Sequence, residues 1–192
     1  MAIDAYMFFV PGDNDPCNIE GETADELQKG VKAFEITDFK WGASSASRDS
    51  ITEPTEKEKE EQKAKKKAGR SAGVRIGTIH VDAFSITKPF DTASLGLFQA
   101  CTTKDAEFAL AKVIFRKMKN DGNPFVYLRF EFTGVKVDKI EWKIKALESS
   151  DKPDEEDVDF SFLTCNIFYT PQSKKGDAKT TKSYTFPSGN EE

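Results

Sequence analysis

Alternation of apolar residues at every second position limits what this chain can fold into more than any other feature. The run from Val158 to Thr170 is an example. One face would carry Val158, Phe160 and Phe162, and the opposite face would carry Leu163, Cys165, Ile167 and Tyr169. Ile3 to Val10 alternates too, with both faces largely apolar, which is typical of a strand buried on both sides. Since side chains of a strand point alternately to opposite faces, these runs predict β-strands. Similar patterns predict further strands within residues 31–42, 74–87, 107–118, 124–133, 135–146 and 183–186.

Three breaks in the alternation predict turns or bends. Phe34 and Ile36 share one face, but Phe39 and Trp41 follow out of phase, which indicates a bulge near Asp38. The sequence KNDGN, residues 119–123, separates two strand patterns and is the strongest hairpin signal in the chain. SSDKPDEED, residues 149–157, is expected to be an acidic loop.

One segment has the period of a helix. Leu95, Leu97, Phe98 and Cys101 would share one side of a helix that begins with Asp91 or Thr92 as its cap. About eight strands and one helix indicate a barrel or a sandwich with a helix closing one side.

Composition restricts the class of protein further. The 192 residues suit one domain, and 16 phenylalanines favour a sheet core, because aromatic side chains pack well on a pleated surface. The net charge of −5 argues against general nucleic-acid binding. No stretch approaches the roughly 20 apolar residues of a membrane-spanning helix. The beginning, MAIDAYMFFV, carries an early Asp4 and no basic residues, so we expect a first strand there and no secretory signal.

The segment Thr52–Arg70 has no apolar face and cannot join a core. Glu dominates its first half and Lys its second, which suits the helix dipole. We interpret it as an exposed insertion, either a solvated helix or a disordered loop. The alternative is that this segment has a function, in which it either contacts a partner or lines a channel.

A search for catalytic chemistry finds no recognisable motif. The single histidine, His80, lies in a strand pattern, and Cys17, Cys101 and Cys165 form no CxxC pair and no zinc spacing. The sequence contains no glycine-rich phosphate loop and no nucleophile elbow. We therefore assign no catalytic, cofactor-binding or metal-binding residue, and favour a structural or assembly role over an enzyme. The alternatives are a barrel that binds a small ligand and a hydrolase whose site is dispersed along the chain.

Several ordered pieces resemble the haemolysin-coregulated protein (Hcp) family of bacterial type VI secretion systems. The opening MAIDAYMFF and the segment FEITDFKWGAS resemble its first two strands. FSITKPFDTASLGLFQACTT, the best match, resembles the family pattern (S/T)-x-T-K-x-x-D that leads into its helix. AKVIFRKM with PFVYLRFEFTGVKVDKIEW resembles the central hairpin, and VDFSFLTCNIFYTPQ resembles a late strand.

The resemblance implies a small β-barrel of two antiparallel sheets with one flanking helix and a charged inserted loop. The helix would pack on the barrel through Leu95, Leu97, Phe98 and Cys101. It implies one domain over residues 1–192, homohexameric rings, and stacking of rings into a hollow tube that is propelled into target cells. Implied partners are sheath, spike and baseplate proteins and effector cargo, without nucleic acid, membrane insertion or a cofactor. The implied location is the bacterial cytoplasm, followed by secretion through the apparatus without a cleavable signal peptide. A tail-tube protein of a related contractile injection particle is the alternative.

The inserted loop departs from the family pattern, because a charged segment stands where the family has an extended loop that packs on a neighbouring subunit. We expect the loop to contribute to contact between subunits or between stacked rings. The residues assigned to this contact are Trp41, Gly42, Ser44, Ser45, Arg70 and Val74.

Overall fold

The computed structural model describes residues 4–12, 15–25, 28, 30–45, 79–144 and 153–187. The chain divides into two compact units, Met1–Trp41 with Ala83–Glu192, and Gly42–Asp82. In the described residues of the second unit, β4 (Ala43–Ser45) pairs antiparallel with β5 (Ile79–Val81). The charged insertion, residues 52–70, lies outside the described residues.

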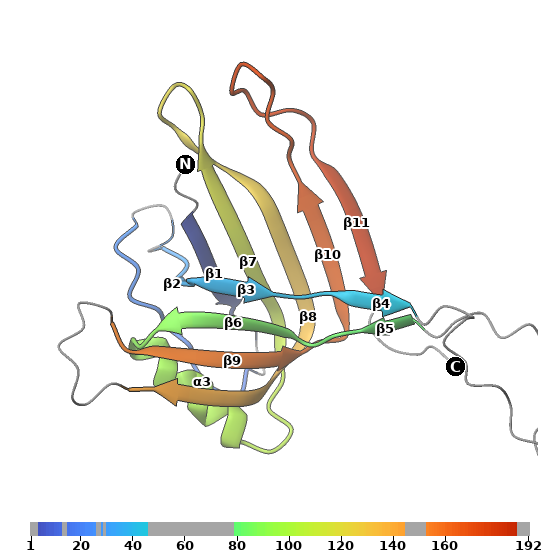
Figure 1. Cartoon of the computed structure of the whole chain (residues 1–192). Helices are drawn as coiled ribbons and strands as arrows, with labels where there is room; N and C mark the ends of the chain where they lie inside the picture. Colours follow the sequence, from blue (N-terminus) through green and yellow to red (C-terminus); the bar gives the residue numbers. More distant parts are fainter. Residues whose placement is uncertain are drawn as a thin grey trace, which may run out of the picture. The chain divides into compact units, whose positions relative to one another are not determined.

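The first unit is built on one antiparallel sheet of nine strands (Figure 1). Its strands are β1 (Asp4–Val10), β2 (Phe34–Glu35), β3 (Asp38–Lys40), β6 (Phe84–Pro89), β7 (Phe108–Met118), β8 (Pro124–Lys143), β9 (Glu155–Ser161), β10 (Thr164–Tyr169) and β11 (Lys182–Pro187). They follow the order β2-β1-β7-β8-β9-β6-β3, while β10 joins β8 and β11 joins β10. The expectation of a mainly β chain with antiparallel strands is confirmed.

Strand β8 belongs to both halves of this sheet. Its first part pairs with β7 and β10, and its second part pairs with β9. The change comes at Gly134, whose φ of 59° lies in the left-handed region that favours glycine. A Cβ at Gly134 would also overlap the side chain of Leu163. The two strands predicted over residues 124–133 and 135–146 are therefore one strand of 20 residues, bent at a glycine.

The described sheet does not close into a barrel, contrary to our expectation. Its path ends at β2 on one side and β3 on the other, with no ladder between them. The two strands are instead consecutive in the chain: Ile36 donates its N–H to Ala5 O at 3.0 Å, and Thr37 donates to Thr87 O at 2.8 Å. The backbone thus changes partner from β1 to β6 within two residues. Since two successive pieces of an extended chain cannot form a ladder with each other, the path stays open, and this change of partner explains the break predicted near Asp38.

The predicted strand Val158–Thr170 is also wrong in detail, because it consists of β9 and β10 with a break at Phe162 and Leu163. Leu163 N–H donates to Thr133 O at 2.8 Å, so the break sits beside the bend of β8. Strand β9 begins at Glu155, and the end of the predicted acidic loop is therefore part of the sheet.

The core of the first unit is rich in phenylalanine, as the composition indicated. Phe84 lies at its centre and stacks on Phe132 and Phe160, with ring centroids 4.0 and 4.8 Å apart. All three side chains are fully buried. Among the described residues, no helix is both long and apolar enough to cross a membrane.

Helix α3 (Thr92–Thr102) lies against β8 (Figure 1). Asp91 caps it, as predicted: its carboxylate accepts the Ala93 N–H at 2.9 Å, and the Ser94 hydroxyl accepts the Asp91 N–H at 3.1 Å. The prediction is confirmed for Leu97, which is fully buried, but the rest of the buried face differs from the predicted stripe. It consists of Ala93, Ser94, Leu97 and Ala100, whereas Leu95 and Phe98 are 65% and 45% exposed and Cys101 is half-buried.

A second segment of the chain approaches α3 closely at Gly96. A Cβ at Gly96 would come within 2.7 Å of Asn18 O, so the segment Cys17–Glu20 crosses the helix there. Thr92 Oγ1 donates to Glu20 O at 2.8 Å, and Cys17 Sγ donates to Gly96 O at 3.3 Å. The helix is held between this segment and the sheet, which the apolar pattern alone does not reveal.

Candidate assembly site

Strand β11 is an edge of the nine-stranded sheet, because β10 is its only partner among the described strands. Thr170 N–H donates to Tyr127 O at 2.8 Å, which fixes the alternation of hydrogen bonds along β10. By that alternation, Lys182, Tyr184 and Phe186 turn their backbone groups toward β10. The N–H and C=O groups of Ser183 and Thr185 point away from it, and they form a template for a further strand.

Two aromatic side chains accompany this edge. Tyr169 and Tyr184 are 47% and 64% exposed, and the register places both on the face of the hairpin that also carries Cys165. Cys165 itself is fully buried. One face of the β10–β11 hairpin is therefore buried in the core at Cys165 and exposed to solvent at Tyr169 and Tyr184.

A second aromatic surface lies beside α3. Trp142 near the end of β8 contacts Phe98 of the helix and Phe90 just before it, with ring centroids 5.0 and 5.5 Å apart. The three side chains are 39%, 45% and 40% exposed, respectively. We call them the aromatic cluster. Grouped exposed rings of this kind mark interaction sites more often than single exposed apolar residues do.

A buried charge network fixes the start of α3. Lys88 and Glu156 are both fully buried, and Lys88 Nζ lies 2.9 Å from Glu156 Oε1. The same ammonium donates to Asp91 Oδ1 at 2.7 Å and to Ser94 Oγ at 3.1 Å. One lysine thus joins β6, β9 and the helix cap. The K-x-x-D spacing before the helix was the sequence signal for part of this network, but nothing local pointed to Glu156.

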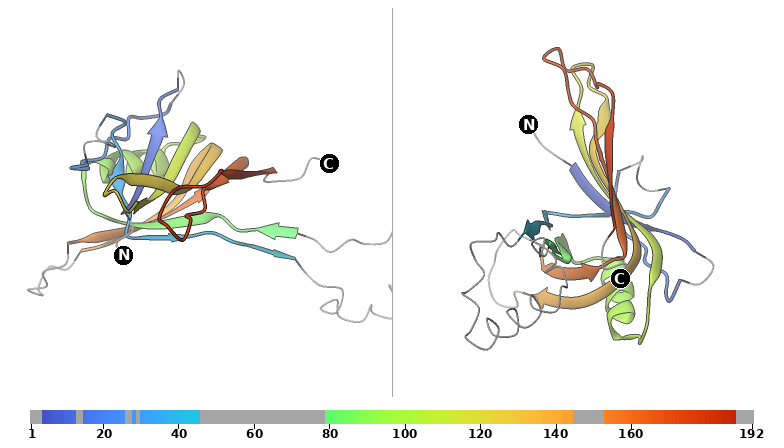
Figure 2. Two further views of the ribbon diagram at one scale, coloured as in Figure 1. Left: turned by 90° about the horizontal axis from the view of Figure 1, so that it is seen from above. Right: turned by 90° about the vertical axis from the view of Figure 1, so that its right-hand side faces the viewer.

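The tips of the β7–β8 and β10–β11 hairpins lie at the same end of the first unit (Figures 1 and 2) and are joined by a hydrogen bond. The Asn120 amide, in the turn between β7 and β8, donates to Lys175 O in the loop between β10 and β11. A side chain at Gly176, where φ is 85°, would overlap Asn120. Gln172 adds a bond to Gly176 O at 2.8 Å. The predicted turn at residues 119–123 is confirmed, and its contact with the second tip orders this end of the sheet.

The residues assigned from sequence to the contact loop do not come together in one described surface. Trp41 packs edge-on against Phe130, Phe132 and Phe162, with centroids 5.6 to 5.7 Å apart, and so belongs to the first unit's core. Gly42, Ser44 and Ser45 belong to the second unit, where Ser44 pairs with His80 and Ser45 with Ile79. Arg70 and Val74 lie outside the described residues.

Reactive groups do not form a cluster in the described part of the chain. No set of three His, Cys, Asp or Glu side chains there could hold a metal ion. The three cysteines are free thiols, and burial raises the pKa of Cys165 to about 12. A thiol with so high a pKa is almost fully protonated at neutral pH, so it is a poor nucleophile.

An antiparallel sheet that presents an unpaired edge beside exposed aromatic rings defines a class of subunit that associates with further chains. Comparison with known families makes the class specific. The family described as "Type VI secretion system effector, Hcp" matches residues 9–169. The chain belongs to this family. A search of curated proteins finds no match.

Solved structures share the fold. One titled "Structure of a type six secretion system protein" is 21% identical, with a TM-score of 0.72, and covers 97% of this chain and 96% of its own. Hcp1 from Salmonella typhimurium is also 21% identical, with a TM-score of 0.64 and coverage of 97% and 95%. A type VI secretion system effector from Yersinia pestis is 18% identical, with a TM-score of 0.60 and coverage of 96% and 99%.

Membership in the family defines the activity. The chain is a structural, non-enzymatic tube protein of a type VI secretion system, and it is secreted through that system. The family function is the assembly of hexameric rings into the inner tube. This matches the role expected from the sequence.

Proposed function

We propose that β11 supplies one side of the contact that builds the ring. The observation that carries this proposal is the direction of the Ser183 and Thr185 backbone groups, which face away from β10 at the edge of the sheet. A neighbouring strand that pairs there would satisfy these groups and extend the sheet from one subunit into the next. The exposed rings of Tyr169 and Tyr184 would then be covered by the same neighbour.

A ring also needs a second, different surface, because a head-to-tail contact repeats until it closes. We assign the aromatic cluster of Phe90, Phe98 and Trp142 to this second surface. The cluster lies on α3, on Phe90 just before it and on the end of β8, whereas Tyr169 and Tyr184 belong to the β10–β11 hairpin. The rings supply apolar area in both places, which suits an interface between subunits.

Further parts of the role follow from the family and are proposals for this chain. Residues 1–192 act as one functional domain, with the charged insertion at residues 52–70 contributing to contact between stacked rings. The protein assembles in the bacterial cytoplasm with sheath, spike and baseplate proteins and carries effector cargo.

Light scattering during size-exclusion chromatography, with negative-stain images of the peak, tests the ring contact. The unaltered chain is expected to elute as rings of six times 21.4 kDa. Ser183→Pro removes one outward N–H without removing a bond to β10, so it should release monomers that keep the β-rich circular dichroism spectrum. Ser183→Ala, which keeps the N–H, is the matched control and should still form rings. Intact rings from Ser183→Pro would refute the role of β11.

The insertion is tested separately. Deleting residues 52–70 should leave the six-subunit mass unchanged but reduce the length of ring stacks in the images. Stacks of unchanged length would show that the insertion does not contribute to axial contact.

A further inference from the structure

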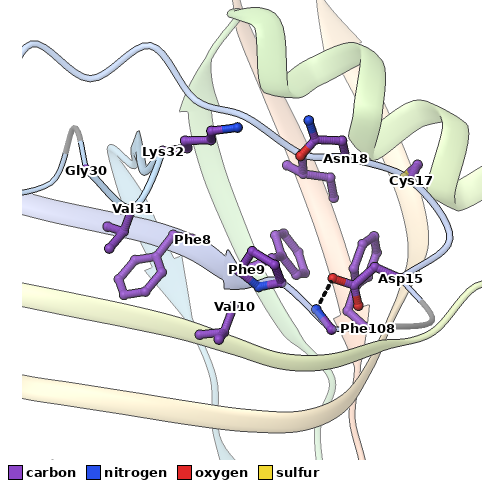
Figure 3. Close-up of a pocket in the computed structure, with 13 residues that line it drawn as sticks. Phe8, Phe9, Val10, Asp15, Cys17, Asn18, Gly30, Val31, Lys32 and Phe108 are labelled. Carbon is purple, nitrogen blue, oxygen red and sulfur yellow. Dashed lines mark hydrogen bonds between the residues drawn. The ribbon is translucent and has the colours of Figure 1, made fainter.

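A cavity of about 480 Å³ opens where β2 separates from β1 (Figure 3). β2 pairs with β1 only at Tyr6 and Met7. If the pairing continued in the same register, Lys32 would lie opposite Phe9. Lys32 instead has a φ of 54°, and its carbonyl accepts the N–H of Gly21 at 2.9 Å. The chain before β2 therefore turns away and leaves a gap beside the end of β1.

The gap exposes one edge of β1. Ile36 N–H donates to Ala5 O, so Ala5 and Met7 face β2 with their backbone groups, and Phe9 is the next residue in that alternation. The N–H and C=O of Phe9 consequently point into the gap, away from β7. Among the described residues, no strand continues the β2 pairing to Phe9.

The walls of the gap suit an extended chain with apolar side chains. Phe9 and Phe108, with ring centroids 4.4 Å apart, form the floor together with Ile19. Phe8 and Val31 lie close together in Figure 3, and Val31 is 43% exposed. The volume falls within the roughly 300–1,000 Å³ of sites that hold small ligands.

We propose that this gap binds an extended peptide segment of another polypeptide, which adds a short antiparallel strand to β1 and places one apolar side chain on Phe9 and Phe108. The peptide residue opposite Phe9 exchanges both backbone hydrogen bonds with it and turns its side chain to the same face as Phe9. The neighbouring peptide residues lie against Phe8 and Val10. The site does not depend on ring formation.

Charge sets the sequence preference of the peptide. An antiparallel strand places its N-terminal side next to Gly12, beyond the end of β1, where the Asp15 carboxylate accepts the Gly12 N–H at 2.7 Å. Lys32, on another wall, forms an ion pair with Glu20. Asp15 thus favours a lysine or arginine three residues before the apolar one.

The test uses the blocked peptide acetyl-Lys-Thr-Thr-Leu-Thr-Thr-amide and the full chain, followed by calorimetry and by hydrogen exchange of the Phe9 amide. We expect a Kd of about 0.1–1 mM. At saturation the Phe9 N–H should exchange about tenfold more slowly, because strand pairing protects it. A peptide with N-methyl-leucine lacks one backbone donor and should bind several-fold more weakly.

A variant that fills the gap with a side chain, and a control that adds the same side chain elsewhere, test where the peptide binds. Gly30 lines the gap and a Cβ there meets no atom within 4 Å, so Gly30→Phe adds a ring at this wall and should weaken binding at least tenfold. Lys174→Phe, in the loop after β10, adds the same ring elsewhere and should leave binding unchanged. Asp15→Asn should weaken the lysine peptide but not its serine analogue.

Three results would overturn the proposal. The first is an absence of binding at about 5 mM peptide, a concentration that would detect even a weak site. The second is binding that Gly30→Phe does not change. The third is binding that leaves Phe9 exchange unaltered, which would indicate an apolar pocket without strand addition.

Discussion

Replacing Glu156 by Gln should destabilise the protein severely, although the change removes no volume and creates no cavity. Lys88 and Glu156 are both fully buried, with Nζ and Oε1 2.9 Å apart. The substitution leaves the Lys88 ammonium in the interior with only Asp91 as a charged partner. Removal of one member of a buried ion pair lowers the free energy of unfolding by about 3–5 kcal/mol, because the other charge loses its compensation. The remaining contact with Asp91 places our expectation at the lower end, about 3 kcal/mol.

Urea unfolding, followed by tryptophan fluorescence at one fixed protein concentration, measures this change. Glu141→Gln is the matched control: Lys139 and Glu141 are also 2.9 Å apart, but their side chains are about 60% exposed, and the midpoint should not move measurably. The double variant Lys88→Met/Glu156→Gln should be more stable than the sum of the single changes, since it removes both buried charges. A midpoint for Glu156→Gln equal to that of Glu141→Gln would refute the argument that burial makes this pair strong.

Three further changes test other parts of the structure. Gly134→Ala should lower stability by more than about 1 kcal/mol in thermal denaturation, because φ is 59° and the new Cβ overlaps Leu163; unchanged stability would contradict the bend. Asp91→Ala should lower stability by more than the about 1–2 kcal/mol of a lost cap, because it also removes the ion pair of Asp91 with the buried Lys88. Asp91→Asn, which can still cap the helix, should lower it by less. Burial raises the pKa of Cys165 from 9.0 to about 12, so the unfolded chain loses this proton first as pH rises. Stability should therefore fall above pH 9, by up to about 1.4 kcal/mol per pH unit, and Cys165→Ala should flatten the dependence in urea titrations.

Local patterns predicted the elements that local physics controls. The cap at Asp91 could be predicted because an aspartate side chain reaches the free N–H groups of the first helical turn, whatever lies nearby. The turn at residues 119–123 could be predicted because Gly122, with a φ of 80°, suits a tight reversal between two strand patterns. The break near Asp38 was visible as a shift of phase, although its cause, the change of partner from β1 to β6, was not.

Features that depend on distant neighbours could not be predicted in this way. The exposed positions of Leu95 and Phe98 depend on how α3 is held between the sheet and the segment Cys17–Glu20. Both residues have apolar side chains, and a helical pattern does not reveal which side meets a second element. The gap beside Phe9 was equally invisible, because it exists only where Lys32 turns the chain away from β1.

The sequence by itself determined the strand-rich class of this protein, its helix and cap, its main hairpin and its resemblance to the tube-protein family. These features follow from the spacing of apolar side chains, the residue types at turns and the order of motifs, all of which can be read from the sequence. Only the tertiary structure decided that Lys88 is buried and that its partner is Glu156, 68 residues away. A lysine is normally solvated, and its charge can enter a core only where the fold brings a carboxylate and a helix cap to the same point.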